Sequence, residues 1–245
     1  MTLLATALTG GLAHAYDSGS PGRDAAHEFY FTRGIYGGGT DGGDAWGPRW
    51  AVDYPKADQQ LLVALRRLTI VDAFDSEHAL RLDDPSLLDF PFVYVLEVGS
   101  LTLSDKQAKA LRNFLLSGGF MVIDDFWGTW EWDSFEEAIR RVFPERAIRE
   151  IPLDHPVFNA FYEISEVLQV PNVYQAGGGS THESDGHVPH VRGIFDDEGR
   201  LMVLINWNTD LGDAWEWADS PNYPLRYSTY AYEMAINFVI YGLSY

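Results

Sequence analysis

Three short apolar runs, separated by segments with helical periodicity, constrain the fold of this chain most. Residues 92–98, 120–123 and 200–206 are almost continuously apolar, which is typical of strands covered on both faces in a parallel sheet. Residues 104–119 lie between the first two runs and carry an apolar stripe at helical spacing, with a serine at the start and two glycines at the end. Strand and helix therefore alternate, as they do in α/β proteins.

The rest of the chain extends this pattern into a single domain. Because crossovers between parallel strands are right-handed in nearly all proteins, the alternation predicts a three-layer, doubly wound, mostly parallel sheet. A chain of 245 residues is long enough to bury one such core. We expect further strands at 28–32, 69–73, 148–151 and 191–195, helices at 58–68, 227–241 and from Asp133 to Pro144, and loops at 34–47 and 171–190.

The N-terminal residues 1–15 form an apolar run that ends in Ala13-His14-Ala15, a pattern typical of a secretory signal peptide and its cleavage site. The basic start of such a signal is missing, so the alternatives are a truncated signal peptide and an apolar arm. The first alternative predicts a periplasmic or secreted protein, with a flexible spacer at 16–27 and one domain at 28–245. No other segment reaches the about 18 apolar residues that span a bilayer, so we expect no membrane span in the mature chain.

The charge and the lack of cysteine exclude several classes of function. The chain has 36 acidic and 17 basic residues and a net charge of −19, which would repel the phosphate backbone of nucleic acids. An anionic membrane surface is disfavoured for the same reason, whereas cations, neutral glycans and basic peptides are compatible with this charge. Without cysteine there are no disulfides, no thiolate metal sites and no cysteine nucleophile.

Acidic side chains follow two of the apolar runs. Glu97 lies at the end of the first run, and Asp124 and Asp125 end the second. In open α/β sheets, ligands bind beyond the carboxyl ends of the strands. Glu97 and one of the two aspartates are therefore candidate catalytic residues, as a general acid and base with or without a divalent cation. The alternative is that both aspartates only cap the following turn.

Amides, acids and indoles are densest in residues 205–219. Such a set can stack on a sugar face and bind its hydroxyl groups, or it can form an Asx-rich turn whose indoles close the core. With Arg33 and Trp127, which also follow predicted strands, the candidate ligand-binding residues are Arg33, Trp127, Asn206, Trp207, Asn208, Asp210, Asp213, Trp215 and Trp217.

Three histidines, His182, His187 and His190, lie close together in the loop 181–190. They are candidate metal ligands, although their spacing does not match the helical pair of a metalloprotease. The alternative is a solvated loop without metal. Apart from a divalent cation here or at the acidic residues, we expect no cofactor, because the chain has no P-loop and no dinucleotide-binding glycine motif after a strand.

Several blocks of the sequence resemble a known family. They lie at residues 53–58, 65–69, 124–128, 152–156 and 208–217, and a Tyr-rich helix follows them. From about Phe29 to the C-terminus the chain is similar to the bacterial domain-of-unknown-function family 4159. This resemblance implies a flavodoxin-like sheet related to the class I glutamine amidotransferase-like superfamily. It also implies a role in the cell envelope, because such proteins are often exported or membrane-attached.

The resemblance does not imply amidotransfer. That activity needs a cysteine on the turn after a central strand, and the corresponding strand of this chain ends in Glu97-Val-Gly-Ser100. Our first hypothesis is an envelope domain that binds a small-molecule, glycan or peptide ligand. The second is the carboxylate hydrolase, and the third is a structural partner in an envelope complex. The sequence alone does not decide whether the chain is an enzyme.

Overall fold

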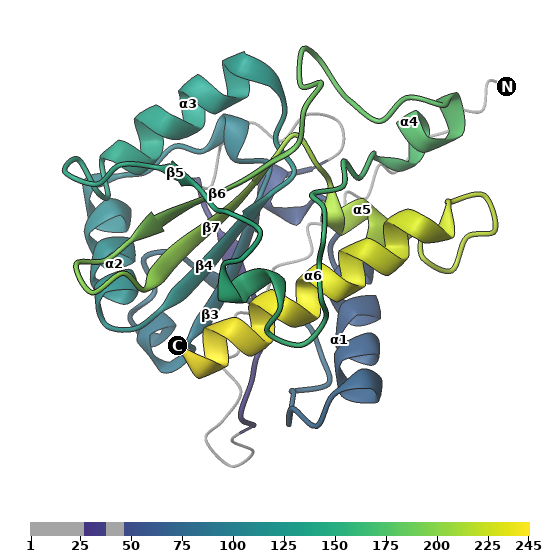
Figure 1. Cartoon of the computed structure of the whole chain (residues 1–245). Coiled ribbons are helices and arrows are strands. Elements are labelled where there is room, and N and C mark those ends of the chain that lie inside the picture. The colour runs from purple at the N-terminus through teal and green to yellow at the C-terminus, as the bar shows by residue number, and fades with distance from the viewer. Residues whose placement is uncertain (1–26, 38–46) are drawn as a thin grey trace, which may run out of the picture.

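The computed structural model describes residues 27–37 and 47–245, and these form an α/β fold around a mixed sheet of seven strands (Figure 1). The strand order is β2-β1-β3-β4-β7-β6-β5. The first five in this order pair in parallel, whereas β6 and β5 add an antiparallel edge. The strands are β1 Thr32–Ile35, β2 His78–Arg81, β3 Phe92–Leu96, β4 Phe120–Asp124, β5 Arg149–Glu150, β6 His190–Phe195 and β7 Leu201–Trp207.

Helices pack on both faces of this sheet (Figure 1). Side chains of α1 and α6 bury one face, and side chains of α2 and α3 bury the other. Tyr94 and Val95, neighbours in the central strand β3, belong to the two different cores, as the alternation of side chains along a strand requires. The helices are α1 Lys56–Leu68, α2 Asp105–Leu116, α3 Gly128–Arg140, α4 Val173–Gly178, α5 Leu211–Glu216 and α6 Leu225–Ser244.

The three central strands and α2 agree with the sequence prediction. Residues of β3 and β4 are buried throughout. Helix α2 begins with the capping box, in which the Gln107 amide donates to Ser104 Oγ at 3.2 Å and the Ser104 amide donates to Gln107 Oε1 at 2.9 Å. The chain leaves this helix through Gly118, whose φ of 104° favours glycine.

Other predicted boundaries are wrong. Helix α3 begins at Gly128 and not at Asp133. Its first backbone amides find acceptors on distant segments, because the Gly128 amide donates to Asn208 Oδ1 and the Thr129 amide donates to Asp185 Oδ1. Within the described residues, the predicted strand 69–73 contributes a single bridge, between Ala73 and Phe29. Strand β2 lies farther along the chain, and β1 begins where the predicted strand 28–32 ends. The predicted loop 171–190 contains α4, and the segment 205–219 contains the end of β7 and helix α5.

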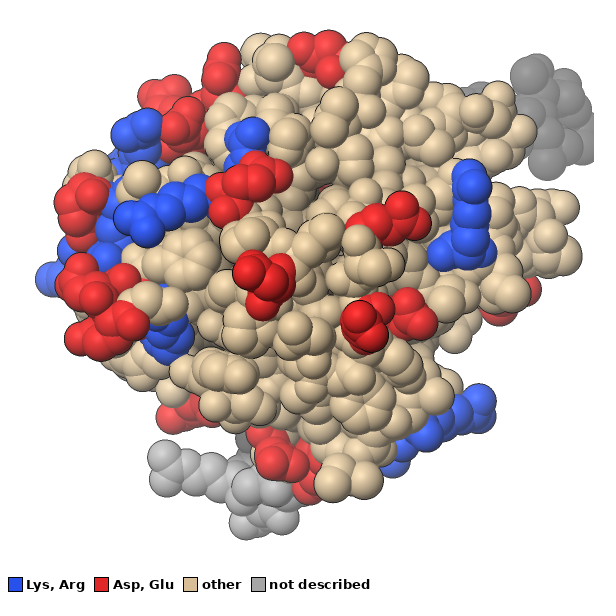
Figure 2. All heavy atoms as spheres, viewed as in Figure 1, with Lys and Arg blue, Asp and Glu red and all other residues tan. Residues whose placement is uncertain are grey.

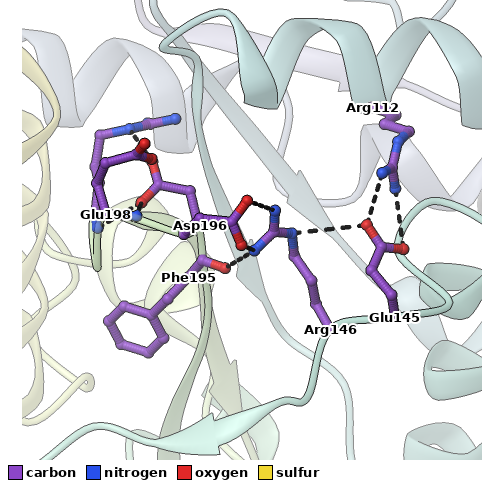
Figure 3. A network of polar contacts seen from close by, with 8 residues as sticks. Arg112, Glu145, Arg146, Phe195, Asp196 and Glu198 are labelled. Atoms are coloured by element: carbon purple, nitrogen blue, oxygen red, sulfur yellow. Dashed lines mark hydrogen bonds and ion pairs between the residues drawn. The ribbon is translucent and has the colours of Figure 1, made fainter.

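A polar network fastens the antiparallel edge to the helices beside it (Figure 3). Arg112 of α2 forms an ion pair with Glu145, at 2.6 Å between Nη2 and Oε1. Arg146 donates to the Phe195 carbonyl at 3.0 Å and forms an ion pair with Asp197. Basic side chains on the viewed face gather mainly toward α2 and β5, where they alternate with acidic ones (Figure 2).

No helix in the described ranges is long and apolar enough to cross a membrane. The predicted signal peptide 1–15 and nearly all of the predicted spacer 16–27 lie outside the described residues, as does most of the predicted loop 34–47. Export and location in the envelope therefore stay predictions.

Candidate functional site

Arg33 does not follow the first strand, as the sequence predicted, but is buried within β1, where it is committed to an ion pair. Its guanidinium pairs with Asp58 of α1, and both side chains are fully buried. Nη1 donates to the Val52 carbonyl at 3.1 Å, and the guanidinium carbon lies 5.0 Å from the centre of the Tyr94 ring. The charge of Arg33 is thus largely balanced by Asp58, and the pair joins α1 to the sheet.

Asp124 ends β4 and anchors the start of α5. Its Oδ2 accepts hydrogen bonds from the Tyr94 hydroxyl at 2.6 Å and from the amides of Leu211 and Gly212 at 3.0 and 3.2 Å. Its Oδ1 is buried and has no hydrogen-bond partner among the described residues. Burial raises the pKa of Asp124 to about 7, although the hydrogen bonds to Oδ2 oppose this rise.

Glu97 and Asp125 both adopt the left-handed backbone conformation, with φ of 54° and 49°, which is uncommon for residues other than glycine, asparagine and aspartate. The Glu97 amide donates to the Asp125 carbonyl at 3.0 Å, so the two turns lie together. The Glu97 carboxylate forms an ion pair with Arg49 at 3.1 Å. Burial raises the pKa of Glu97 to about 7, and the charge of Glu131 raises it further while Arg49 lowers it.

A group of carboxylates gathers between these turns and α5. Oxygen atoms of Asp53, Asp125 and Asp210 all lie within 4.8 Å of one another, and so do oxygen atoms of Asp53, Asp213 and Glu216. We call these five residues the acidic cluster. Asp125 and Asp210 come from the ends of β4 and β7, as the sequence predicted for the edge of the sheet.

Asp53 belongs to both groups, and the sequence analysis did not single it out. It lies in the connection between β1 and α1, with a φ of 62°. Its Oδ2 is buried and accepts no hydrogen bond from the residues that the structure describes. Asp53 opens the block 53–58 that resembles the family, but by residue type it was only an acid shortly before a predicted helix, which is common in loops without function.

The acidic cluster is short of positive charge. Burial raises the pKa of Asp53, Asp125 and Asp210 well above the usual value, and in each case the neighbouring carboxylates raise it further. Arg33 opposes this rise at Asp53, but it is already paired with Asp58. The cluster must therefore hold protons or a cation.

The acidic cluster lies in a part of the chain that matches a known protein family. The family described as "Domain of unknown function (DUF4159)" matches residues 35–243. The chain belongs to this family. All five members of the acidic cluster and Glu97 lie within the matched residues of the DUF4159 domain. Comparison with curated proteins gave no match.

Two of the indoles chosen from the sequence lie inside the DUF4159 domain and are not available to stack on a sugar. Trp215 is fully buried and packs against Phe31 and Tyr94. Trp127 is 4% exposed, and its Nε1 donates to Asp125 Oδ1 at 3.0 Å. The spacing of Leu211, Ala214 and Trp215 is that of a buried helical face, a signal that the polar residues between them obscured.

Trp207 and Trp217 are half-buried at different places. Trp207 stacks on His190 with ring centres 5.0 Å apart, and Arg192 covers its ring. Trp217 lies beside the acidic cluster, where its Nε1 donates to Asp213 Oδ1 at 3.2 Å and Lys56 covers its ring. These two indoles therefore do not form one platform with Trp127 and Trp215.

Of the two candidate asparagines, Asn208 is held by hydrogen bonds within the fold and Asn206 is held less completely. Asn208 accepts from the Gly128 amide at 2.8 Å through Oδ1 and donates to the Val188 carbonyl at 2.7 Å. Asn206 is buried, and its Nδ2 has no partner in the described part of the chain.

The three histidines do not form one group. The rings of His182 and His187 lie 4.2 Å apart, whereas His190 contacts Trp207 and pairs with Glu150 at 3.0 Å. Among the described residues, neither set of converging ligand atoms includes a histidine.

Proposed function

We propose that this DUF4159 domain is a divalent-cation-dependent hydrolase of the cell envelope, and that its site is the acidic cluster together with Glu97. The observation that carries the proposal is the convergence of Asp53, Asp125 and Asp210, whose oxygen atoms lie within 4.8 Å of one another. One of the buried oxygens, Asp53 Oδ2, has no hydrogen-bond partner in the described ranges.

The electrostatic cost of this arrangement supports a bound cation. Two unit charges separated by 4.8 Å repel each other by about 3 kcal/mol at an effective dielectric constant of about 20. Three ionised carboxylates form three such pairs, so their repulsion amounts to about 10 kcal/mol, comparable to the whole stability of a typical domain. Near neutral pH, a divalent cation can remove this repulsion without protonating the carboxylates.

The donors favour a hard cation. All ligand atoms in the cluster are carboxylate oxygens, without sulfur or imidazole nitrogen. Mg²⁺, Ca²⁺ and Mn²⁺ prefer such ligands, whereas zinc sites usually contain cysteine or histidine. When bound, the cation would polarise an oxygen of the substrate.

Glu97 can transfer the proton that hydrolysis requires. Its pKa of about 7 allows it to accept a proton from an attacking water and to return it to the leaving group near neutral pH. The left-handed turn after β3 fixes its backbone, and Arg49 holds its carboxylate. Glu97 acts electrostatically on the acidic cluster, because its charge contributes to the raised pKa of Asp125.

The proposal includes descent from a flavodoxin-like, amidotransferase-like ancestor without amidotransferase activity. The order β2-β1-β3-β4, with helices on both faces, supports the descent. Glu97 occupies the turn after β3, where an amidotransferase of this type would need its cysteine, and the chain has no cysteine.

A second candidate is a ligand-binding domain for a glycan or peptide. The half-buried Trp217 favours it, because this indole lies at the acidic cluster and contacts Asp213 directly. A ligand carrying a positive group could contact the ring and the carboxylates together.

Cation binding followed by a search for hydrolysis tests the proposal. Chelator-treated protein would be titrated with Mg²⁺, Ca²⁺ and Mn²⁺ by calorimetry and then assayed with chromogenic esters, phosphates, glycosides and peptides. We expect binding and cation-dependent turnover in one substrate class, both lost in D210N and kept in D133N, which removes an exposed carboxylate from α3. No binding at millimolar cation would overturn the proposal, whereas binding without turnover would favour the second candidate.

A further inference from the structure

We infer that Asp53 bridges two cation sites, one with Asp125 and Asp210 and a second with Asp213 and Glu216. This inference rests on the proposed cation site and extends it to a two-metal centre. The second group meets the same geometric condition as the first, because its three ligand oxygens lie within 4.8 Å of one another.

Helix α5 presents the second pair of ligands on one face. Asp213 and Glu216 are three residues apart, a spacing that places side chains next to each other on a helix. Asp213 is buried and Glu216 is half-buried, so the second site lies nearer the surface than the site of Asp125 and Asp210.

Two buried carboxylate oxygens lack hydrogen-bond partners among the described residues. This observation indicates a bound ligand separately from the convergence of the carboxylates. Asp124 is fully buried, and its Oδ1 has no hydrogen-bond partner in the described structure, while its Oδ2 binds the amides at the start of α5. Asp53 Oδ2 is likewise buried and unpartnered. Buried polar atoms are rarely left without a partner, so two such oxygens beside one short helix indicate that something positive binds there.

Gly212 explains how Asp53 reaches both sites. A Cβ atom at this position would lie 2.3 Å from Asp53 Oδ2, so any other residue would displace the carboxylate. Gly212 is helical, where glycine costs about 1 kcal/mol relative to alanine. Its place between Asp210 and Asp213 lets the Asp53 carboxylate contact the helix between the two sets of ligands.

The existing hydrogen bonds of Asp213 are compatible with a ligand role. Its Oδ2 accepts from the Val173 amide at 2.6 Å, and its Oδ1 accepts from Trp217 Nε1 at 3.2 Å. Each carboxylate oxygen has a further lone pair, and such hydrogen bonds orient ligands in metal sites. Lys56, the basic residue whose charge acts on Glu216, is already paired with Asp219 at 3.0 Å.

The number of bound Mn²⁺ ions tests the bridge. Chelator-treated full-length protein would be titrated with Mn²⁺, with the bound metal counted and its electron paramagnetic resonance recorded. We expect two ions per chain with a spin-coupled signal, and one ion without coupling in E216Q. The control E137Q removes an exposed carboxylate from α3 and should keep both ions.

A glycine variant keeps the inference falsifiable if E216Q does not fold. G212A should displace Asp53 and weaken both ions at least tenfold. Its control G177A adds a methyl group in α4, where no atom lies within 4 Å of the new carbon, and should bind as wild type does. One ion in wild type with unchanged binding in E216Q, or two ions bound by G212A with the affinity of wild type, would refute the bridge and leave the single site intact. No bound Mn²⁺ at all would refute both proposals.

Discussion

Replacing Asp210 by asparagine separates the electrostatic role of this residue from its structural role. Asp210 Oδ1 caps α5 by accepting from the Asp213 amide at 2.7 Å, and asparagine caps helices as well as aspartate does. The substitution therefore keeps the cap and removes one of three charges that lie within 4.8 Å of one another. Without a cation, D210N should be more stable than wild type.

The size of this gain follows from the spacing of the charges. Two of the three repulsive pairs disappear, which would relieve about 7 kcal/mol if all three carboxylates were ionised. Protons already relieve most of this repulsion in the cation-free protein, because burial and the neighbouring carboxylates raise the pKa of Asp210. We therefore expect D210N to gain about 1–3 kcal/mol at mildly alkaline pH.

The response to cation should change in the opposite direction. A ligand at a hundred times its dissociation constant stabilises a protein by about 2.7 kcal/mol, which raises the Tm of a domain of this size by about 5–10 °C. Wild type should show this shift with the cation that binds best, and D210N should lose it. Urea and thermal unfolding with and without cation measure both effects, and D133N serves as the control. A D210N protein that is less stable than wild type without cation, or that keeps the full shift, would refute the reasoning.

Three further predictions test the fold and its titration. In the cation-free protein, Asp124 alone should lower the unfolding free energy by about 4 kcal/mol as pH rises from about 4 to about 7, because native Asp124, with its pKa near 7, retains a proton that the unfolded chain releases; urea unfolding across this range should show a smaller total loss in D124N than in wild type. W215A should cost about 3–5 kcal/mol by removing a fully buried indole, whereas W130A at the exposed Trp130 should change stability by less than about 0.5 kcal/mol in the same assay. S104A should cost about 1 kcal/mol in chemical unfolding by removing the cap of α2, and an unchanged midpoint would contradict the capping box.

The sequence could predict those parts of the fold whose signals are local. The apolar runs of β3, β4 and β7 and the capping box at Ser104 each lie within one segment, so periodicity and residue type were sufficient. The start of α3 was not predictable in this way, because Asn208 and Asp185 supply acceptors for its first amides from far along the chain. Strand β2 was missed because it has only four residues, two of them His78 and Arg81.

The candidate site was predictable only in part for the same reason. Asp125 and Asp210 follow apolar runs, so their place at the edge of the sheet could be expected. Asp53 follows no such run and joins them only through the path of the chain between β1 and α1. Trp215 shows the converse, because its polar neighbours left open both a ligand-binding surface and a turn whose indoles close the core, and its contacts with Phe31 and Tyr94 place it in the core.

The outermost strand β5 has a consequence for how copies of this protein meet. It is only two residues long, and both of them, Arg149 and Glu150, are charged and exposed. A strand from another molecule would find few unpaired backbone groups there and would have to bury both charges. Sheet extension at this border is therefore a poor route to self-association.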